Sequence, residues 1–185
     1  MIKKIKDDTR QKMDKSISLL TQELAKIRTG RATPALLDGV KVEYYESLLP
    51  LNQVASISIP EPRLIVIQPW DKQALSTIEK AIYKADLGIT PNNDGNVIRL
   101  SLPPLTSERR EELVKLAQKL AEESRIAIRN IRRDANNELK KIEKDKKISN
   151  DDYFKAQEEI QKMTDEYIKK VDEVLKKKEK EIREL

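Results

Sequence analysis

Four arginines between Glu123 and Asp134 are the side chains of this sequence best suited to hold an anion. A guanidinium makes two directed hydrogen bonds to a phosphate and can stack on a base, a chemistry that lysine does not reproduce. No acidic residue interrupts the stretch, although the chain elsewhere mixes both charges freely. We therefore treat these arginines as candidate ligands for a polyanion; they are Arg125, Arg129, Arg132 and Arg133.

Helical spacing places three of these arginines on one ridge beside a buried stripe. At about 100° per residue, Arg125, Arg129 and Arg132 lie within roughly 60° of one another, and Arg133 lies just off the ridge. The ridge is either an anion-binding surface or a solvated face that pairs with carboxylates of a neighbouring helix. Periodicity leaves both interpretations open, while the use of arginine in a lysine-rich chain favours binding. The candidate pairing carboxylates are Glu158, Glu166 and Glu173.

A second basic element, KIRTGRATP at residues 26–34, places Arg28 and Arg31 around Gly30. Taken alone, it is explained more simply as a helix end whose last-turn cations offset the helix dipole. Spacing does not settle whether this element lies next to the ridge, because the stagger between the helices does not follow from it.

Composition excludes most catalytic chemistry. The chain has no Cys and no His, so disulfides, thiolate or imidazole metal sites and Ser-His or Cys-His pairs are excluded. It contains no GxxxxGK[ST] motif, and its four glycines never cluster, so no nucleotide site is indicated. Isolated acids such as Glu43 and Asp94 have no identifiable partner. We expect a protein that is not an enzyme and has no cofactor or metal.

The chain shows no targeting or membrane segment. Its N-terminus, MIKKIKDDTRQKM, lacks the apolar core of a signal peptide, and no run approaches the ~20 apolar residues of a membrane span. We expect a soluble, cytoplasmic monomer that does not contact a membrane.

Apolar spacing predicts helices at both chain ends and strands between them. Residues 2–28 carry one apolar stripe, which we expect to end at Gly30 and Pro34. A helix of some 35–40 residues is predicted to begin at Thr106 or Ser107, and another after Ser149. β-branched runs predict the strands, with one helix from an Asp71 N-cap to a Gly88 C-cap. The predicted strands are KVEYY, VASISI, RLIVI and NVIRLSL, the last one preceded by an NNDG turn.

Three amphipathic helices separated by a β-rich insert predict a two-domain α+β protein. Residues 1–29 and 106–185 would form a long antiparallel three-helix bundle, and residues 31–104 an inserted β/α/β domain. The insert has seven basic and eight acidic residues, a net charge of −1, so the bundle carries the remaining +6. Two crossings, at 29–32 and 103–106, form a candidate hinge. Its residues are Thr29, Gly30, Arg31, Pro103, Pro104, Leu105 and Thr106.

Several of these segments together resemble the bacterial ribosome recycling factor family. The resemblance runs almost end to end and in the family's order, and implies an L-shaped protein with the two domains predicted above. It is carried by KIRTGRATPALLDGVKVEYY, VIQPWDKQALSTIEKAI, KADLGITPNNDGNVIRLSLPPLTSERR, IRNIRRDAN and IQKMTDEYIKKVDEVLKKKEKEI.

The resemblance implies a function that spacing could not show. Proteins of this family bind the post-termination ribosome through large-subunit ribosomal RNA and, with elongation factor G and GTP, split the subunits and release transfer RNA and messenger RNA. By resemblance, Arg132 is the residue most closely tied to ribosome binding, with Arg129 and Arg28 or Arg31 as neighbouring contacts. The alternative is a structural coiled-coil or RNA-binding scaffold without a recycling role.

One segment, VEYYESLLPLNQV, departs from the family pattern. Glu46 stands where the family commonly has a glycine-containing turn. If the turn needs a positive φ, then either it is rebuilt or Glu46 is strained, and Leu48 and Leu49 could form an apolar tip.

Overall fold

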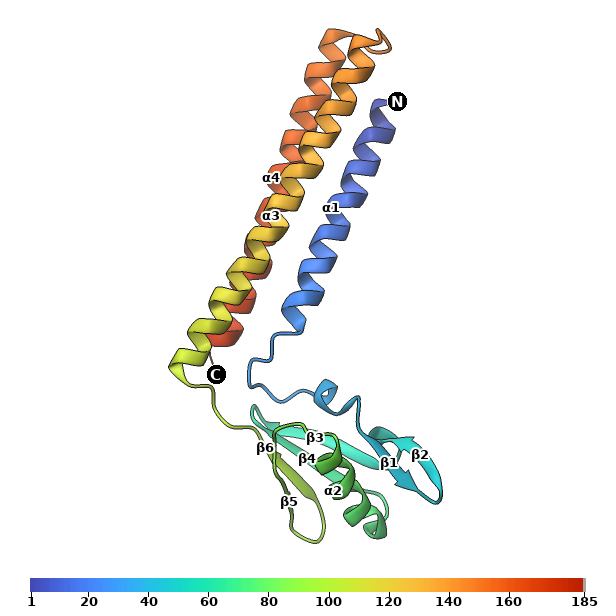
Figure 1. Ribbon diagram of the computed structural model, residues 1–185, viewed down its shortest axis with the longest axis vertical. Coiled ribbons are helices and arrows are strands. Elements are labelled where there is room, and N and C mark those ends of the chain that lie inside the picture. Colours follow the sequence, from blue (N-terminus) through green and yellow to red (C-terminus); the bar gives the residue numbers. More distant parts are fainter. Residues whose placement is uncertain (185) are drawn as a thin grey trace. The chain divides into compact units, whose positions relative to one another are not determined.

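The computed structural model describes residues 1–184, which divide into two compact units (Figure 1). Residues 1–28 and 107–184 form the first unit, and residues 29–106 form the second. The first is all-helical and the second contains the strands, as predicted. No helix within residues 1–184 combines the length and apolar character that crossing a bilayer requires.

The first unit is a bundle of α1 (Ile2–Ala25), α3 (Ser107–Lys144) and α4 (Asn150–Arg183). Each helix contacts the other two, and α3 runs antiparallel to both α1 and α4 (Figure 1). At 1.5 Å per residue, α3 is roughly 57 Å long. The prediction of a long antiparallel three-helix bundle is confirmed.

One buried stripe on each helix forms the bundle core. The buried residues recur at three- and four-residue steps, which is why these segments are stable as helices only when packed together. On α3, the buried seam includes Ala121, Ile128 and Leu139, whereas Leu120, Ala127 and Ile131 are only half-buried. Further core residues are Met13, Leu20 and Leu24 of α1, and Ile160, Tyr167 and Val171 of α4.

The helix ends match the prediction at α4 but not at α1. Ser149 Oγ accepts a hydrogen bond from the Asp152 amide at 3.0 Å and caps α4. Helix α1 ends at Ala25, because the Lys26 and Ile27 amides bond to carbonyls three residues back and tighten the last turn. Gly30 does adopt a φ of +75°, but it lies beyond that end and is not the cap.

The second unit contains a four-stranded antiparallel sheet in the order β3-β4-β6-β5 and a separate hairpin, β1-β2 (Figure 1). Strands β2 and β5 were not predicted, because each is short and holds a proline. The strand bounds are β1 Lys41–Tyr44, β2 Ser47–Pro50, β3 Ala55–Glu61, β4 Leu64–Pro69, β5 Pro91–Asn93 and β6 Ile98–Ser101.

One hydrophobic core joins the sheet, the hairpin and α2 (Leu75–Lys84). Ile65 and Ile67 of β4 pair with Leu100 and Ile98 of β6, and all four side chains are fully buried. Because antiparallel strands alternate their side chains, the opposite face carries Arg99 and Ser101 of β6, which are exposed, beside the half-buried Leu64 and Val66 of β4.

Helix α2 differs from its prediction at both ends. The Asp71 carboxylate accepts a hydrogen bond from the Gln73 amide at 2.9 Å, but it caps a 3-10 turn, Lys72–Ala74, and α2 begins at Leu75. Its C-cap is Ala85, not Gly88. Asp86, with a φ of +47°, terminates the helix first; aspartate is one of the few residues that tolerate the left-handed region.

The turns of the two tight hairpins differ: one is held by side-chain hydrogen bonds, and the other consists of two residues with positive φ. In the β5-β6 turn the Asp94 carboxylate accepts hydrogen bonds from the Val97 and Asn96 amides, which with Arg99 lower the pKa of Asp94 to about 2. In the β1-β2 hairpin Tyr44 pairs with Ser47, so the loop is only Tyr45 and Glu46. Both have positive φ, +46° and +60°, the type I′ geometry that glycine and asparagine normally fill. Glu46 is therefore strained, which is one of the two alternatives that the sequence left open.

Candidate functional site

The arginine ridge, defined here as Arg125, Arg129 and Arg132, lies along α3 on the bundle. Its members are unequally accessible: the side chain of Arg125 is 19% exposed and that of Arg129 is 48% exposed. Arg132 is half-buried, and Arg133, off the ridge, is exposed. Side-chain partners decide how much charge each arginine can offer an anion.

Arg125 is an inter-helix tie. Its Nε and Nη2 donate to Asp172 Oδ1 of α4 at 3.0 and 2.6 Å, and Nη1 donates to Glu122 Oε2 at 2.9 Å. The hydrogen bonds that Arg125 donates to Asp172 are the main cause of the raised pKa of Arg125. Two carboxylates thus neutralise this guanidinium, so the solvated-pair interpretation holds for Arg125, with Asp172 as the partner.

Glu122 also accepts a hydrogen bond from Arg129: Arg129 Nη1 donates to Glu122 Oε1 at 3.2 Å. Hydrogen bonds from Arg125 and then Arg129 lower the pKa of Glu122, which keeps this carboxylate ionised. Arg129 nevertheless has four further N–H donors and an exposed side chain, so it can bind a phosphate while it stays paired with Glu122.

Arg132 differs because its partner is uncharged. Its Nη1 donates to Gln161 Oε1 of α4 at 3.1 Å, and Gln161 Nε2 in turn donates to Asp165 Oδ1 at 2.9 Å. The amide positions the guanidinium without cancelling its charge, and the remaining donors stay available. Arg133 has no side-chain partner among residues 1–184.

The partners Gln161, Glu122 and Asp172 were not identified from the sequence. Which α4 side chains face the ridge depends on the register between α3 and α4, and apolar periodicity does not fix that register. The predicted partner Glu158 instead forms an ion pair with Lys162 at 3.1 Å, within α4.

The second basic element is divided between the two units. Arg28 belongs to the bundle and Arg31 to the inserted unit, and both are exposed. Arg28 lines a groove of about 380 Å³ between α1 and α3, together with Arg109 and Leu116. Leu116 lies sixteen residues before Arg132, roughly 24 Å along the helix, so Arg28 is not part of the ridge.

The predicted hinge residues include a close contact inside the second unit. A Cβ added to Gly30 would lie 3.2 Å from Leu105 Cγ, so the two crossings run side by side at this point. Each crossing is also fixed to the β3-β4 turn: the Ala32 amide donates to Pro62 O at 2.7 Å, and the Leu102 amide donates to Arg63 O at 2.8 Å.

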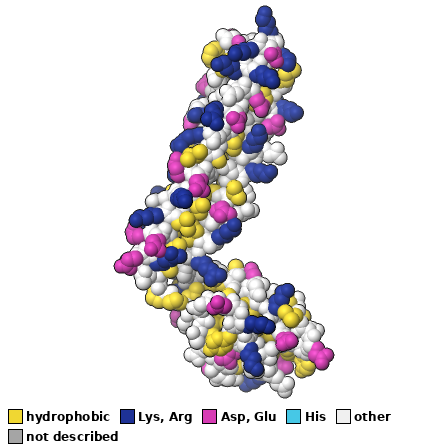
Figure 2. Space-filling model, in the orientation of Figure 1, with side chains coloured by type: hydrophobic (Ala, Val, Ile, Leu, Met, Phe, Trp, Pro, Cys, Tyr) yellow, Lys and Arg dark blue, Asp and Glu magenta, His cyan; other side chains and the backbone are white. Residues whose placement is uncertain are grey.

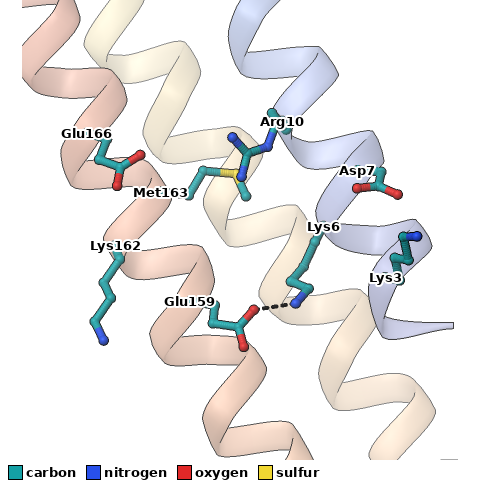
Figure 3. A pocket seen from close by; sticks show the side chains of 8 residues that line it. All are labelled: Lys3, Lys6, Asp7, Arg10, Glu159, Lys162, Met163 and Glu166. Carbon is teal, nitrogen blue, oxygen red and sulfur yellow. Dashed lines mark hydrogen bonds and ion pairs between the residues drawn. The ribbon is translucent and has the colours of Figure 1, made fainter.

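A groove of about 540 Å³ lies between α1 and α4. Figure 3 shows the side chains that line it. Lys6 forms an ion pair with Glu159 across it, and the buried Met163 forms its floor. Four cations and three carboxylates line it, so it has almost no net charge and resembles an inter-helix ion-pair seam more than an anion site. The remaining lining residues are Lys3, Asp7, Arg10, Lys162 and Glu166.

No group of three or more metal-ligating side chains lies together within the described part of the chain. On α3, the guanidinium groups of Arg129, Arg132 and Arg133 keep donors that can bind a phosphate.

Comparison with known families shows the family of proteins in which this surface occurs. The family model described as ribosome recycling factor matches residues 20–182. The chain belongs to the ribosome recycling factor family. The resemblance seen in the sequence is thus confirmed, and it places the chain among the proteins of ribosome recycling in translation.

Ribosome recycling factor relatives match over most or all of their length. The ribosome-recycling factor of Shouchella clausii is 58% identical over 185 residues, covering 100% of both chains. That of Carboxydothermus hydrogenoformans is 63% identical over 157 residues, covering 85% of each chain.

Solved ribosome recycling factor structures confirm the two-domain α+β fold. A solution structure of the ribosome recycling factor is 43% identical with a TM-score of 0.73, covering 100% of this chain and 98% of that chain. A second match is 50% identical with a TM-score of 0.61 and covers 98% of each chain. It is described as part of models of the T. thermophilus ribosome recycling factor and the E. coli elongation factor G bound to the E. coli post-termination complex.

Proposed function

We propose that this protein binds the post-termination ribosome in the cytoplasm and, with elongation factor G and GTP, separates the subunits and releases transfer RNA and messenger RNA. The observation that carries this is the match over 98% of both chains to a ribosome recycling factor described together with elongation factor G on the post-termination complex.

The bundle holds ribosomal RNA through its arginines. Arg132 is the principal contact, because its side-chain partner within residues 1–184, Gln161, is neutral and leaves the full charge for a phosphate. Arg129 and Arg133 contribute exposed guanidinium groups beside it, and Arg28 and Arg31 contribute separate contacts. Structured RNA is recognised mostly through shape and phosphate contacts, which suits a row of arginines without base-reading groups.

Arg125 has a positioning role. Its bonds to Asp172 and Glu122 fix α3 against α4, and so keep the ridge in one register. This role replaces the direct RNA contact expected of Arg125 from helical spacing alone.

The protein acts mechanically and is not an enzyme. GTP hydrolysis belongs to elongation factor G, and the crossings at 29–32 and 103–106 let the inserted unit move while the bundle stays on RNA. The fixing of both crossings to Pro62 and Arg63 supports this hinge, because it confines bending to the few residues between that turn and the helices.

A light-scattering assay of subunit separation tests the proposed function. Post-termination ribosomes should separate when this protein, elongation factor G and GTP are all present, and should stay intact when any one is omitted. Separation without this protein, or hydrolysis of GTP by the isolated chain, would refute the assignment.

A further inference from the structure

Arg132 of α3 and Asp165 of α4 are joined by one side chain, that of Gln161. Arg132 Nη1 donates to Gln161 Oε1 at 3.1 Å, and Gln161 Nε2 donates to Asp165 Oδ1 at 2.9 Å. Gln161 and Asp165 are four residues apart on α4, a spacing at which side chains on a helix surface meet. The three residues thus form one hydrogen-bonded chain from a guanidinium to a carboxylate, which we call the Arg132 chain.

The two ends of the Arg132 chain determine how its central amide is oriented. A guanidinium only donates hydrogen bonds and an ionised carboxylate only accepts them, whereas a glutamine amide accepts at its oxygen and donates at its nitrogen. A single orientation of the Gln161 amide therefore satisfies both neighbours, with Oε1 toward Arg132 and Nε2 toward Asp165. Because Gln161 is exposed, it can adopt other rotamers once the contact with Asp165 is removed.

The amide also separates the carboxylate of Asp165 from the guanidinium of Arg132. Carboxylates are interspersed with Lys and Arg side chains over the bundle face shown in Figure 2, so direct pairing is readily made on this surface. Arg125 is an example, since its Nη2 donates to Asp172 Oδ1 at 2.6 Å. A direct partner offsets the charge that attracts a phosphate, whereas a carboxylate beyond an amide lies farther away and offsets less of that charge. The Arg132 chain is thus suited to orient a cation that stays free for an anion.

Orientation affects the affinity of Arg132 because an arginine side chain has many rotamers. Fixing such a side chain on a phosphate costs rotamer entropy. A guanidinium that Gln161 already holds has lost part of this freedom in the unbound protein, so it loses less when it binds. Each hydrogen bond of the Arg132 chain therefore contributes to the affinity for the anion.

We propose that Asp165 is a positioning residue for Arg132 and acts through Gln161. The inference rests on the proposed function, in which Arg132 contacts a phosphate of ribosomal RNA. An exposed carboxylate near an RNA-binding surface repels phosphates, so its removal ordinarily strengthens binding. Removal of the Asp165 carboxylate has the opposite effect and weakens binding, because it releases Gln161 and then Arg132.

Binding to isolated large ribosomal subunits distinguishes positioning from simple electrostatics. Asp165→Ala should bind about threefold more weakly than wild type, as expected for the loss of one orienting hydrogen bond. Asp165→Glu keeps a carboxylate acceptor and should stay within about twofold of wild type.

Glu158→Ala is the matched control. Glu158 is an exposed carboxylate of α4 three residues before Gln161, and it pairs with Lys162 instead. Each alanine substitution thus removes one negative charge and one contact between residues four apart on α4. Urea denaturation should give the two variants the same unfolding midpoint, whereas Glu158→Ala should bind the subunits at least as tightly as wild type.

A double-mutant cycle with Arg132→Ala separates positioning from a general effect on the fold. In the Arg132→Ala background, Asp165→Ala should not weaken binding further, since no guanidinium is left to orient. Equal weakening by Asp165→Ala in both backgrounds would show a structural role and overturn the proposal.

The Arg132 Nε–H group provides a readout that does not depend on the ribosome. Its order parameter from NMR relaxation should fall in Asp165→Ala and keep the wild-type value in Glu158→Ala. An unchanged order parameter in Asp165→Ala, or binding by this variant as tight as that of Glu158→Ala, would overturn the proposal. Wild-type binding by Arg132→Ala, with a lowered order parameter in Asp165→Ala, would support the positioning and refute instead the RNA contact in the proposed function.

Discussion

The four arginines of α3 meet different partners, and the partner decides what each can bind. Arg125 is enclosed by the carboxylates of Asp172 and Glu122, whereas Arg132 contacts the amide of Gln161. A carboxylate offsets the charge that a phosphate would otherwise attract, while an amide only orients it. The same residue type therefore serves packing at one position and binding at another.

Arg125→Ala should lower the free energy of unfolding of the bundle by about 1 kcal/mol, since it removes an inter-helix ion pair and the packing of a long aliphatic stem. Arg133→Ala, on the same helix but exposed and unpaired among residues 1–184, should change it by less than about 0.5 kcal/mol. Urea denaturation followed by far-ultraviolet circular dichroism measures both. Equal effects of the two substitutions would contradict the positioning role.

Tyr167 ties α4 to α1 through a hydrogen bond from its hydroxyl to Asp14 Oδ1. Burial, and then the Asp14 carboxylate, raise the pKa of Tyr167 to about 12 from 10.0. The folded state thus keeps this proton where the unfolded state has lost it. The resulting stability is complete below pH 10 and is lost as pH rises through about 12.

We expect Tyr167→Phe to lower the free energy of unfolding by about 1 kcal/mol at pH 8. The difference between the two proteins should shrink as pH rises from 10 toward 12, which pairwise denaturation at each pH will measure. A difference that stays constant over this range would show that the Tyr167 hydroxyl does not titrate as described.

At the scale of single elements, the β1-β2 hairpin is the place where local preference and structure disagree most. Glu46→Gly should raise the free energy of unfolding of the inserted unit by about 1 kcal/mol, because glycine adopts positive φ without a Cβ clash. Trp70, the only tryptophan of the chain, lies in this unit, so its fluorescence follows the relevant transition. Gly39→Ala, at a glycine without positive φ, is the control. A loss of stability in Glu46→Gly would contradict the strain.

Elements with a strong internal signal could be predicted from the sequence. Ser149 caps α4 as expected, and α3 begins at Ser107, because capping and apolar spacing are local properties. Strands β2 and β5 could not be predicted, since three or four residues containing a proline are extended only when a neighbouring strand pairs with them. Helix ends near Gly30 and Gly88 were misplaced because earlier residues, Ile27 and Asp86, had already left the helical geometry.

The same limit applies to the candidate site. Helical spacing alone grouped Arg125, Arg129 and Arg132, but it could not distinguish among them. That distinction depends on which α4 residues face α3, a tertiary property that follows from core packing at Ile128, Ile160 and their neighbours.

At the scale of the whole molecule, charge is divided unequally between the two units. The bundle segments carry the net positive charge and the inserted segment carries a small negative charge. This division fits a bundle that binds RNA and an inserted unit that contacts protein.

The measurement that tests the central claim most directly is ribosome binding of Arg132→Ala across a salt series. Wild type, Arg132→Lys and Lys177→Ala are measured in parallel; Lys177 is an exposed cation on α4, sixteen residues from Gln161, roughly 24 Å along the helix. Arg132→Ala should bind at least about tenfold more weakly, with a salt slope smaller by about one. Arg132→Lys should restore affinity only in part, since lysine lacks the planar fork. If Arg132→Ala binds ribosomes as tightly as Lys177→Ala and with the same salt slope, the arginine ridge does not hold the ribosome.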